Sequence, residues 1–157
     1  MQKITACLWF EDKAEEAVRF YTSIFKNSKM GKISYYGEGA PRPKGSVLTV
    51  SFKLDGQEFL ALNGGPEFKF SEAVSFIVNC ATQKEVDRMW DKLSEGGEQV
   101  QCGWLKDKFG LSWQVVPTIL GKLITDRDSA KAARVIQAVM QMKKLDIAGL
   151  KKAYAGR

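Results

Sequence analysis

The sequence contains no histidine among its 157 residues. Histidine is the commonest metal ligand and the usual acid–base group near neutral pH, so any acid–base catalysis falls to carboxylates, lysines or tyrosines. Cysteine is scarce too: Cys7, Cys80 and Cys102 lie far apart, and no Cys-x-x-Cys motif occurs. We therefore expect reduced thiols that pack as small apolar side chains, and neither a zinc site nor a disulfide.

Long apolar runs are also missing. No stretch approaches the roughly 20 residues that are needed to cross a bilayer. The N-terminal apolar run is short and is followed at once by acidic residues, unlike a signal peptide. We expect a soluble, cytoplasmic protein with no membrane partner. An apolar fraction of 45% is enough for a core, and the length fits one domain, or one domain with a helical appendage.

Basic residues exceed acidic ones, giving a net charge of +6. They are spread along the chain among acids and are only mildly enriched near its end, at Lys143, Lys144, Lys151, Lys152 and Arg157. A nucleic-acid surface would combine clustered Lys and Arg with aromatic stacking or a reading motif. We expect a solvated basic tail and no nucleic-acid partner.

An internal repeat is the main feature that is present. Residues 4–25 predict a strand followed by an amphipathic helix, and residues 74–93 predict the same pair again. We expect Asp12, with Glu15, to cap the first helix (13–25) and Thr82 to cap the second (83–94). Strands are expected at 4–10, 30–37, 46–54 and 57–63, and again at 73–80, 98–101, 103–106 and 112–116. The order βαβββ occurs twice, which indicates an α+β fold.

Helical periodicity replaces strand alternation after Pro117. Apolar residues at 119–124 have helical spacing, and a helix is expected at 129–143 with Asp128 as its cap. A last short helix is expected at 146–154. These amphipathic helices need a surface to pack against, either their own sheet or a partner subunit.

The repeat, together with AVRFYTSIF (17–25), NGGPEFKFSEAVSFIV (63–78) and DKFGLSWQVVP (107–117), resembles the vicinal-oxygen-chelate (glyoxalase/bleomycin-resistance/dioxygenase) superfamily. It is most similar to the PhnB-like branch, often labelled 3-demethylubiquinone-9 3-methyltransferase-like, whose ending the segment KLDIAGLKKAY also resembles. The resemblance implies a domain over 1–117, with modules at about 1–65 and 66–117 forming a curved mixed sheet around a pocket. It further implies a C-terminal helical extension (118–157) and a homodimer.

Metal-dependent members of the superfamily place His and Glu ligands on equivalent strands of the two modules. The resemblance aligns Ala6, Thr49, Val74 and Gln114 with those positions. Ala and Val cannot bind a cation, and neutral Thr and Gln bind one weakly. We therefore expect no metal and no cofactor. The glycine-rich segments do not lie between a strand and a helix, so the residues do not support methyl transfer from S-adenosylmethionine.

Strand alternation predicts the lining of the pocket. On the last strand it sends Ser112 and Gln114 to one face and Trp113 to the other. With Thr49 and Ser51 these residues form our candidate ligand-binding set, although each could instead complete a hydrogen bond of the sheet. Ala6 is expected on the pocket face together with Leu8 and Phe10. Three tryptophans could stack on a ligand or pack in the core or a dimer interface: Trp9, Trp104 and Trp113.

No pair of nucleophile and base is evident, so no catalytic residue is assigned. Glu58 and Glu72 are expected to face solvent, unless one of them faces the pocket as a base of raised pKa. Our leading hypothesis is a metal-free protein that binds an apolar or aromatic small molecule. The alternatives are an enzyme acting on a small organic substrate (a metal-dependent lyase or dioxygenase, or a methyltransferase) and an interaction protein with a closed pocket.

Overall fold

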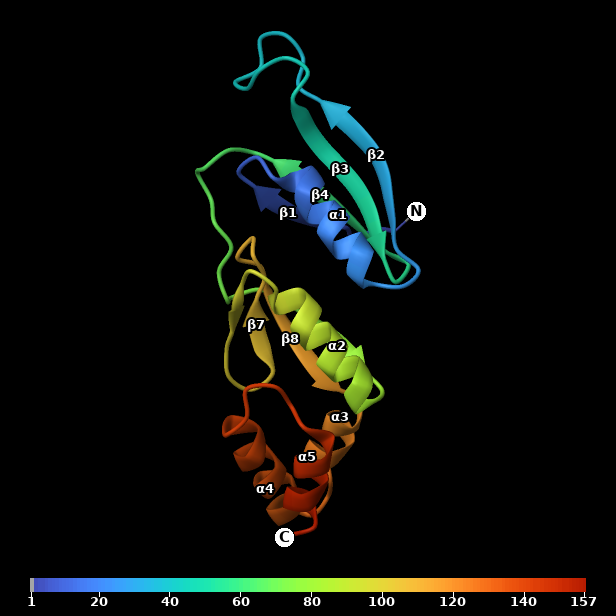
Figure 1. Ribbon diagram of the computed structural model, residues 1–157, viewed down its shortest axis with the longest axis vertical. Helices are drawn as coiled ribbons and strands as arrows, with labels where there is room; N and C mark the ends of the chain where they lie inside the picture. The colour runs from blue at the N-terminus through green and yellow to red at the C-terminus, as the bar shows by residue number, and fades with distance from the viewer. Residues whose placement is uncertain (1) are drawn as a thin grey trace. The chain divides into compact units, whose positions relative to one another are not determined.

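The computed structural model describes residues 2–157, drawn in Figure 1. These residues form two compact units that divide between Phe70 and Ser71. Each unit contains one four-stranded sheet with a helix on one face, and the second unit also includes the C-terminal helices. No helix within the described residues is long and apolar enough to span a membrane.

The first unit follows the order β1 (Ala6–Phe10), α1 (Ala14–Ile24), β2 (Lys29–Tyr35), β3 (Val47–Leu54) and β4 (Gln57–Asn63). Its sheet order is β1-β4-β3-β2, with β1 parallel to β4 and the other pairs antiparallel. The buried side of α1 packs on this sheet, where the ring of Tyr21 stacks on that of Phe52.

The second unit repeats this topology with β5 (Ser75–Cys80), α2 (Gln83–Ser94), β6 (Glu98–Gln99), β7 (Trp104–Lys106) and β8 (Ser112–Pro117). Its sheet order is β5-β8-β7-β6, again with the first strand parallel to the last. The predicted α+β class and the duplicated βαβββ order are therefore confirmed.

Three helices complete the second unit: α3 (Ile119–Ile124), α4 (Ser129–Met140) and α5 (Ile147–Tyr154). They enclose a small core of their own around Leu123, Val135 and Leu150. Figure 1 shows them gathered beyond β8 at the C-terminal end of the chain. We call residues 118–157 the helical extension.

The helical extension is fixed to the second module by several contacts. The Gln83 side chain donates to the Leu145 carbonyl (3.2 Å) and accepts from the Ile147 N–H (2.8 Å). The carbonyls of Met142 and Lys143 each accept a backbone N–H from the turn before β7, both at 2.7 Å. These bonds explain why α4 ends at Met140 and not at 143 as predicted: the next residues bond to the module instead of continuing the helix.

Two of the three predicted helix caps are confirmed. Thr82 accepts the N–H of Glu85 at 3.2 Å, and Asp128 accepts the N–H groups of Ala130 and Lys131. The prediction for Asp12 is wrong. The residue before α1 is Lys13, which makes no side-chain cap, and the N–H of Ala14 donates instead to the Asn63 side chain on β4.

Candidate functional site

Each sheet has one face covered by its helix and one face that no helix of its module covers, which we call the open face. In the first module the open face carries Cys7, Leu60 and Ser51 in one cross-strand row, as the strand register shows. The next row on the same face contains Trp9, Leu62 and Thr49. In the second module the open face carries Ser75, Ser112 and Lys106, followed by Ile77, Gln114 and Trp104.

The prediction that Ala6, Leu8 and Phe10 line the pocket is wrong. Leu8 and Phe10 are 6% and 4% exposed and belong to the core under α1. Because side chains alternate along a strand, Ala6 shares that face, and Cys7 and Trp9 take the open one. Every residue of β1, ACLWF, is small or apolar, so the sequence alone does not fix which face is buried.

Thr49 and Ser51 lie on the open face of the first module, but their hydroxyls already have partners. The Thr49 Oγ1 lies 2.5 Å from the Oγ of Ser34 on β2. The Ser51 Oγ accepts the Lys32 N–H at 2.8 Å, within the stretch where the pairing of β2 with β3 shifts register. Both side chains therefore join the two strands where regular backbone pairing is interrupted.

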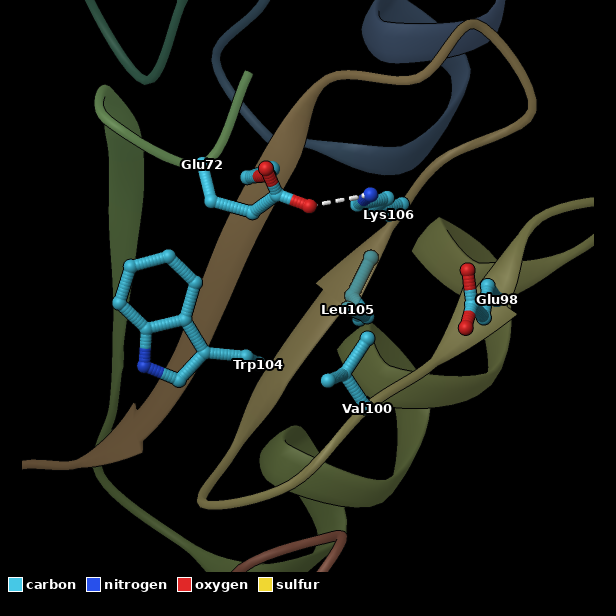
Figure 2. Close-up of a pocket in the computed structure, with 7 residues that line it drawn as sticks. Glu72, Glu98, Val100, Trp104, Leu105 and Lys106 are labelled. Carbon is cyan, nitrogen blue, oxygen red and sulfur yellow. Dashed lines mark ion pairs between the residues drawn. The ribbon is translucent and has the colours of Figure 1, made fainter.

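The second module has an open pocket of about 370 Å³ on the uncovered side of its sheet. Ser112 belongs to the pocket, and Gln114 lies one row further along the same face. Figure 2 shows the pocket with its side chains. The lining residues come from the segment before β5, from β6, β7 and β8, and from the residue that follows β6: Glu72, Glu98, Val100, Trp104, Leu105, Lys106 and Ser112.

The hydroxyl of Ser112 is the unusual feature of this pocket. Ser112 is 1% exposed, and its Oγ has no hydrogen-bond partner within residues 2–157. A buried polar group without a partner costs roughly 1–3 kcal/mol, so such groups are rare in folded proteins. The nearby Gln114 differs, because its amide donates to the Ser75 Oγ at 3.0 Å. Among the described residues, the Ser112 hydroxyl is therefore a buried pocket-lining atom that is free to form a hydrogen bond.

An ion pair between Glu72 and Lys106 lies beside this hydroxyl. Glu72 belongs to the segment before β5 and Lys106 to β7, and Figure 2 shows the two side chains directed toward each other. The hydrogen bond from Lys106 lowers the pKa of Glu72, and the same bond raises the pKa of Lys106. Glu72 does reach the pocket, but its lowered pKa is the opposite of what a carboxylate acting as a base at neutral pH needs.

Of the three tryptophans considered from the sequence, only Trp104 lines the pocket. Trp113 is buried on the helix-covered face, where its Nε1 donates to the Asp107 carboxylate at 2.9 Å. Trp9 donates from its Nε1 to the Gly65 carbonyl at 2.9 Å, and its ring meets Phe68 edge to face. Glu58 is not in the pocket and pairs with Lys53 at 3.8 Å.

The donor groups at the positions aligned with metal ligands do not fit a divalent cation. Ala6 is on the covered face, Val74 is exposed ahead of β5, and the hydroxyl of Thr49 is held by Ser34. Within residues 2–157 no three His, Cys, Asp or Glu side chains come together as a metal site would require. The two carboxylates that line the pocket have no third ligand beside them among the described residues, and Glu72 is bonded to Lys106.

The chain contains two βαβββ modules, and in each the first strand pairs in parallel with the last and one sheet face is open. This arrangement is the vicinal-oxygen-chelate fold, the fold of small-molecule-binding proteins of the glyoxalase type. The chain belongs to the 3-demethylubiquinone-9 3-methyltransferase family, whose model matches residues 2–116.

Solved structures agree with this assignment. The chain is 40% identical to a PhnB protein from Bacillus cereus, with a TM-score of 0.69 over 74% of this chain and 100% of that one. A protein from Pseudomonas aeruginosa is 20% identical, with a TM-score of 0.62 over 74% and 98%. The fosfomycin resistance protein FosX from Listeria monocytogenes shares the fold at 12% identity, with a TM-score of 0.51 over 78% and 97%. No curated protein sequence is significantly similar.

Proposed function

We propose that the protein binds a small, flat, neutral molecule without a metal, and that the pocket of the second module is its binding site. The observation that carries the proposal is the buried Ser112 hydroxyl, which lines this pocket and has no hydrogen-bond partner among residues 2–157. A ligand with one hydroxyl or carbonyl group would complete its hydrogen bonding. Pockets of this kind combine an apolar wall with a few polar groups that fix orientation.

The rest of the lining restricts the chemistry of the ligand. Trp104 and Val100 supply apolar surface, and the indole offers a face for a flat ring. The charged groups are two carboxylates, Glu72 and Glu98, against one ammonium, Lys106. An anionic ligand would meet a net negative lining, so a neutral one is favoured. No observation in the pocket favours an enzyme, because no base is bonded to Ser112 among the described residues and the pKa of Glu72 is lowered.

Paired probes of nearly the same shape test the proposal. We expect p-cresol to shift the NMR amide signals of Ser112 and Trp104 and to bind about five- to tenfold tighter than toluene, as one hydrogen bond of roughly 1–1.5 kcal/mol implies. The anion 4-methylbenzoate is expected to bind more weakly than p-cresol.

Two variants and a control make the test specific. Ser112→Ala should remove the advantage of p-cresol over toluene, and Trp104→Ala should weaken both probes. Ser129→Ala, an exposed serine at the start of α4, should change neither. The proposal fails if the shifts map elsewhere, or if p-cresol keeps its advantage in Ser112→Ala.

A further inference from the structure

The net charge of the protein is concentrated in the helical extension. The chain has 24 Lys and Arg and 18 Asp and Glu. Residues 118–157 contain nine of the basic residues and three of the acidic ones. Residues 1–117 therefore carry fifteen of each and are neutral overall, so the whole net charge of +6 lies in the extension. The extension also lies outside residues 2–116, which match the family.

The three acids of the extension all have structural partners. Asp128 caps α4, and Asp146 caps α5 by accepting the Gly149 N–H at 2.9 Å. Asp126 accepts the Tyr154 hydroxyl at 2.7 Å and also the backbone N–H of Asp128. These carboxylates serve helix ends and a turn, and none forms an ion pair with a basic residue among those described.

Three of the nine basic residues are similarly occupied. Arg134 donates to the carbonyls of Ala153 and Tyr154 at the end of α5, and Lys131 lies over the Tyr154 ring. Lys144 pairs with Asp87 at 2.9 Å. The other six are exposed and form no ion pair within residues 2–157: Lys122, Arg127, Lys143, Lys151, Lys152 and Arg157.

Bulky apolar side chains are exposed next to some of these cations. Ile136 and Met140 lie one turn apart on α4, 46% and 63% exposed, and Ile124 is exposed on α3. Lys122 and Lys143 are within three positions of Ile124 and Met140 along the chain. Exposed apolar residues beside unpaired cations are the combination that binds the interface of an anionic bilayer, where the apolar groups enter the headgroup region.

We propose that the helical extension binds the surface of anionic phospholipid bilayers. This differs from the sequence-based expectations of a solvated basic tail and of no membrane partner, because the unpaired state of the six cations and the exposure of the apolar residues are visible only in the fold. A second copy of the chain fits this surface less well than an anionic bilayer, since two extensions of net charge +6 repel each other. Nucleic acid is also poorer, because the one aromatic ring of the extension, Tyr154, is already covered by Lys131.

Vesicle flotation with the full-length protein tests the proposal. We expect binding to vesicles of phosphatidylglycerol and phosphatidylcholine, none to phosphatidylcholine alone, and release in about 1 M NaCl, where the screening length falls to ~3 Å. Each cation near such a surface strengthens binding roughly fivefold, so Lys122→Gln/Lys143→Gln should weaken it at least roughly tenfold. The control Lys26→Gln/Lys29→Gln removes two exposed lysines of the first module and should have little effect.

A second pair of variants separates lipid from nucleic acid. Ile136→Ser/Met140→Ser alters only exposed positions and should weaken vesicle binding severalfold. Binding to duplex DNA that survives this change, with no binding to vesicles, would overturn the proposal in favour of a nucleic-acid surface. Failure to bind either would mean a solvated tail and would also overturn it. Neither result bears on p-cresol binding in the pocket, which is measured separately.

Discussion

The side chain of Asn63 on β4 accepts the backbone N–H of Ala14, the first residue of α1, at 2.8 Å. The side-chain amide also donates to the Val47 carbonyl at 3.1 Å, and the backbone carbonyl of Asn63 accepts the Tyr36 hydroxyl at 2.6 Å. One buried side chain thus ends a strand, caps a helix and anchors the start of β3. This long-range contact replaces a local cap at the start of the helix.

We expect Asn63→Ala to lower the free energy of unfolding by about 2–3 kcal/mol. This is the sum of the lost helix cap at Ala14 and of the Val47 carbonyl left without its hydrogen bond. Asp12→Ala is the matched control, since Asp12 was the cap predicted from sequence. It should change stability by less than about 0.5 kcal/mol, as exposed positions without partners do. Urea denaturation measures both, and equal losses in the two variants would show that the cap is local after all.

The same contact shows what the sequence could and could not reveal about the fold. Thr82 and Asp128 were predicted as caps because a cap residue lies next to its own helix. Asn63 lies 49 positions from its partner, and only the parallel pairing of β1 with β4 brings the two together. The repeat order was predictable because it depends on apolar periodicity, which is also local.

The site was partly predictable for similar reasons. Alternation along β8 placed Ser112 and Gln114 on one face, as the structure has them. Trp104 was named from the sequence only as one of three tryptophans that could stack on a ligand. Lys106 was missed because β7 has only three residues, and its register depends on the preceding turn. Cys102 and Gly103 both have positive φ there, 61° and 82°, and a non-glycine residue in that conformation is not expected from its type.

The Glu72–Lys106 ion pair predicts a specific pKa change. Because Lys106 lowers the pKa of Glu72, Lys106→Gln should raise that pKa toward its ordinary value near 4.5. In the native protein the ion pair stabilises the fold fully at pH values above the ordinary pKa of 4.5. This contribution is lost as the pH falls through the lowered pKa of Glu72. A ¹³C NMR titration of the Glu72 carboxyl measures the shift. Lys84→Gln, another surface lysine, should leave it unchanged, and an unmoved titration in Lys106→Gln would refute the pairing.

Two of the three cysteines, Cys80 and Cys7, should differ in reactivity. Burial, assisted by the negative charge of Glu85, raises the pKa of the Cys80 thiol to about 12. The thiolate is the reactive form, so iodoacetamide at pH 8 should leave Cys80 unmodified until the protein unfolds. Burial also raises the pKa of Cys7, which is exposed enough to react, but more slowly than free cysteine. Peptide mass spectrometry over time measures each site, and labelling of Cys80 as fast as Cys7 would contradict its burial.

The raised pKa of Cys80 also gives a direction for alkaline stability. A group whose pKa is higher in the folded state stabilises the fold below its unfolded value and loses that contribution as the pH rises through the folded one. For Cys80 this interval runs from 9.0 to about 12. Cys80→Ala should therefore lose less stability across these pH values than the native protein does, as measured by urea midpoints.

The protein should remain folded and unchanged in ligand binding when metals are removed. The positions that align with the metal ligands of the superfamily supply no anionic ligand. The pocket has two carboxylates, Glu72 and Glu98, and Glu72 is bonded to Lys106. Divalent cations need several oxygen or nitrogen donors, usually with carboxylate or imidazole among them. We therefore expect treatment with EDTA to leave both the melting temperature and the p-cresol affinity unchanged.

Zinc or manganese added back should have no effect either, and elemental analysis of untreated protein should find less than one metal ion per chain. Stoichiometric metal that is lost together with p-cresol binding would refute the metal-free proposal and favour the lyase or dioxygenase alternative.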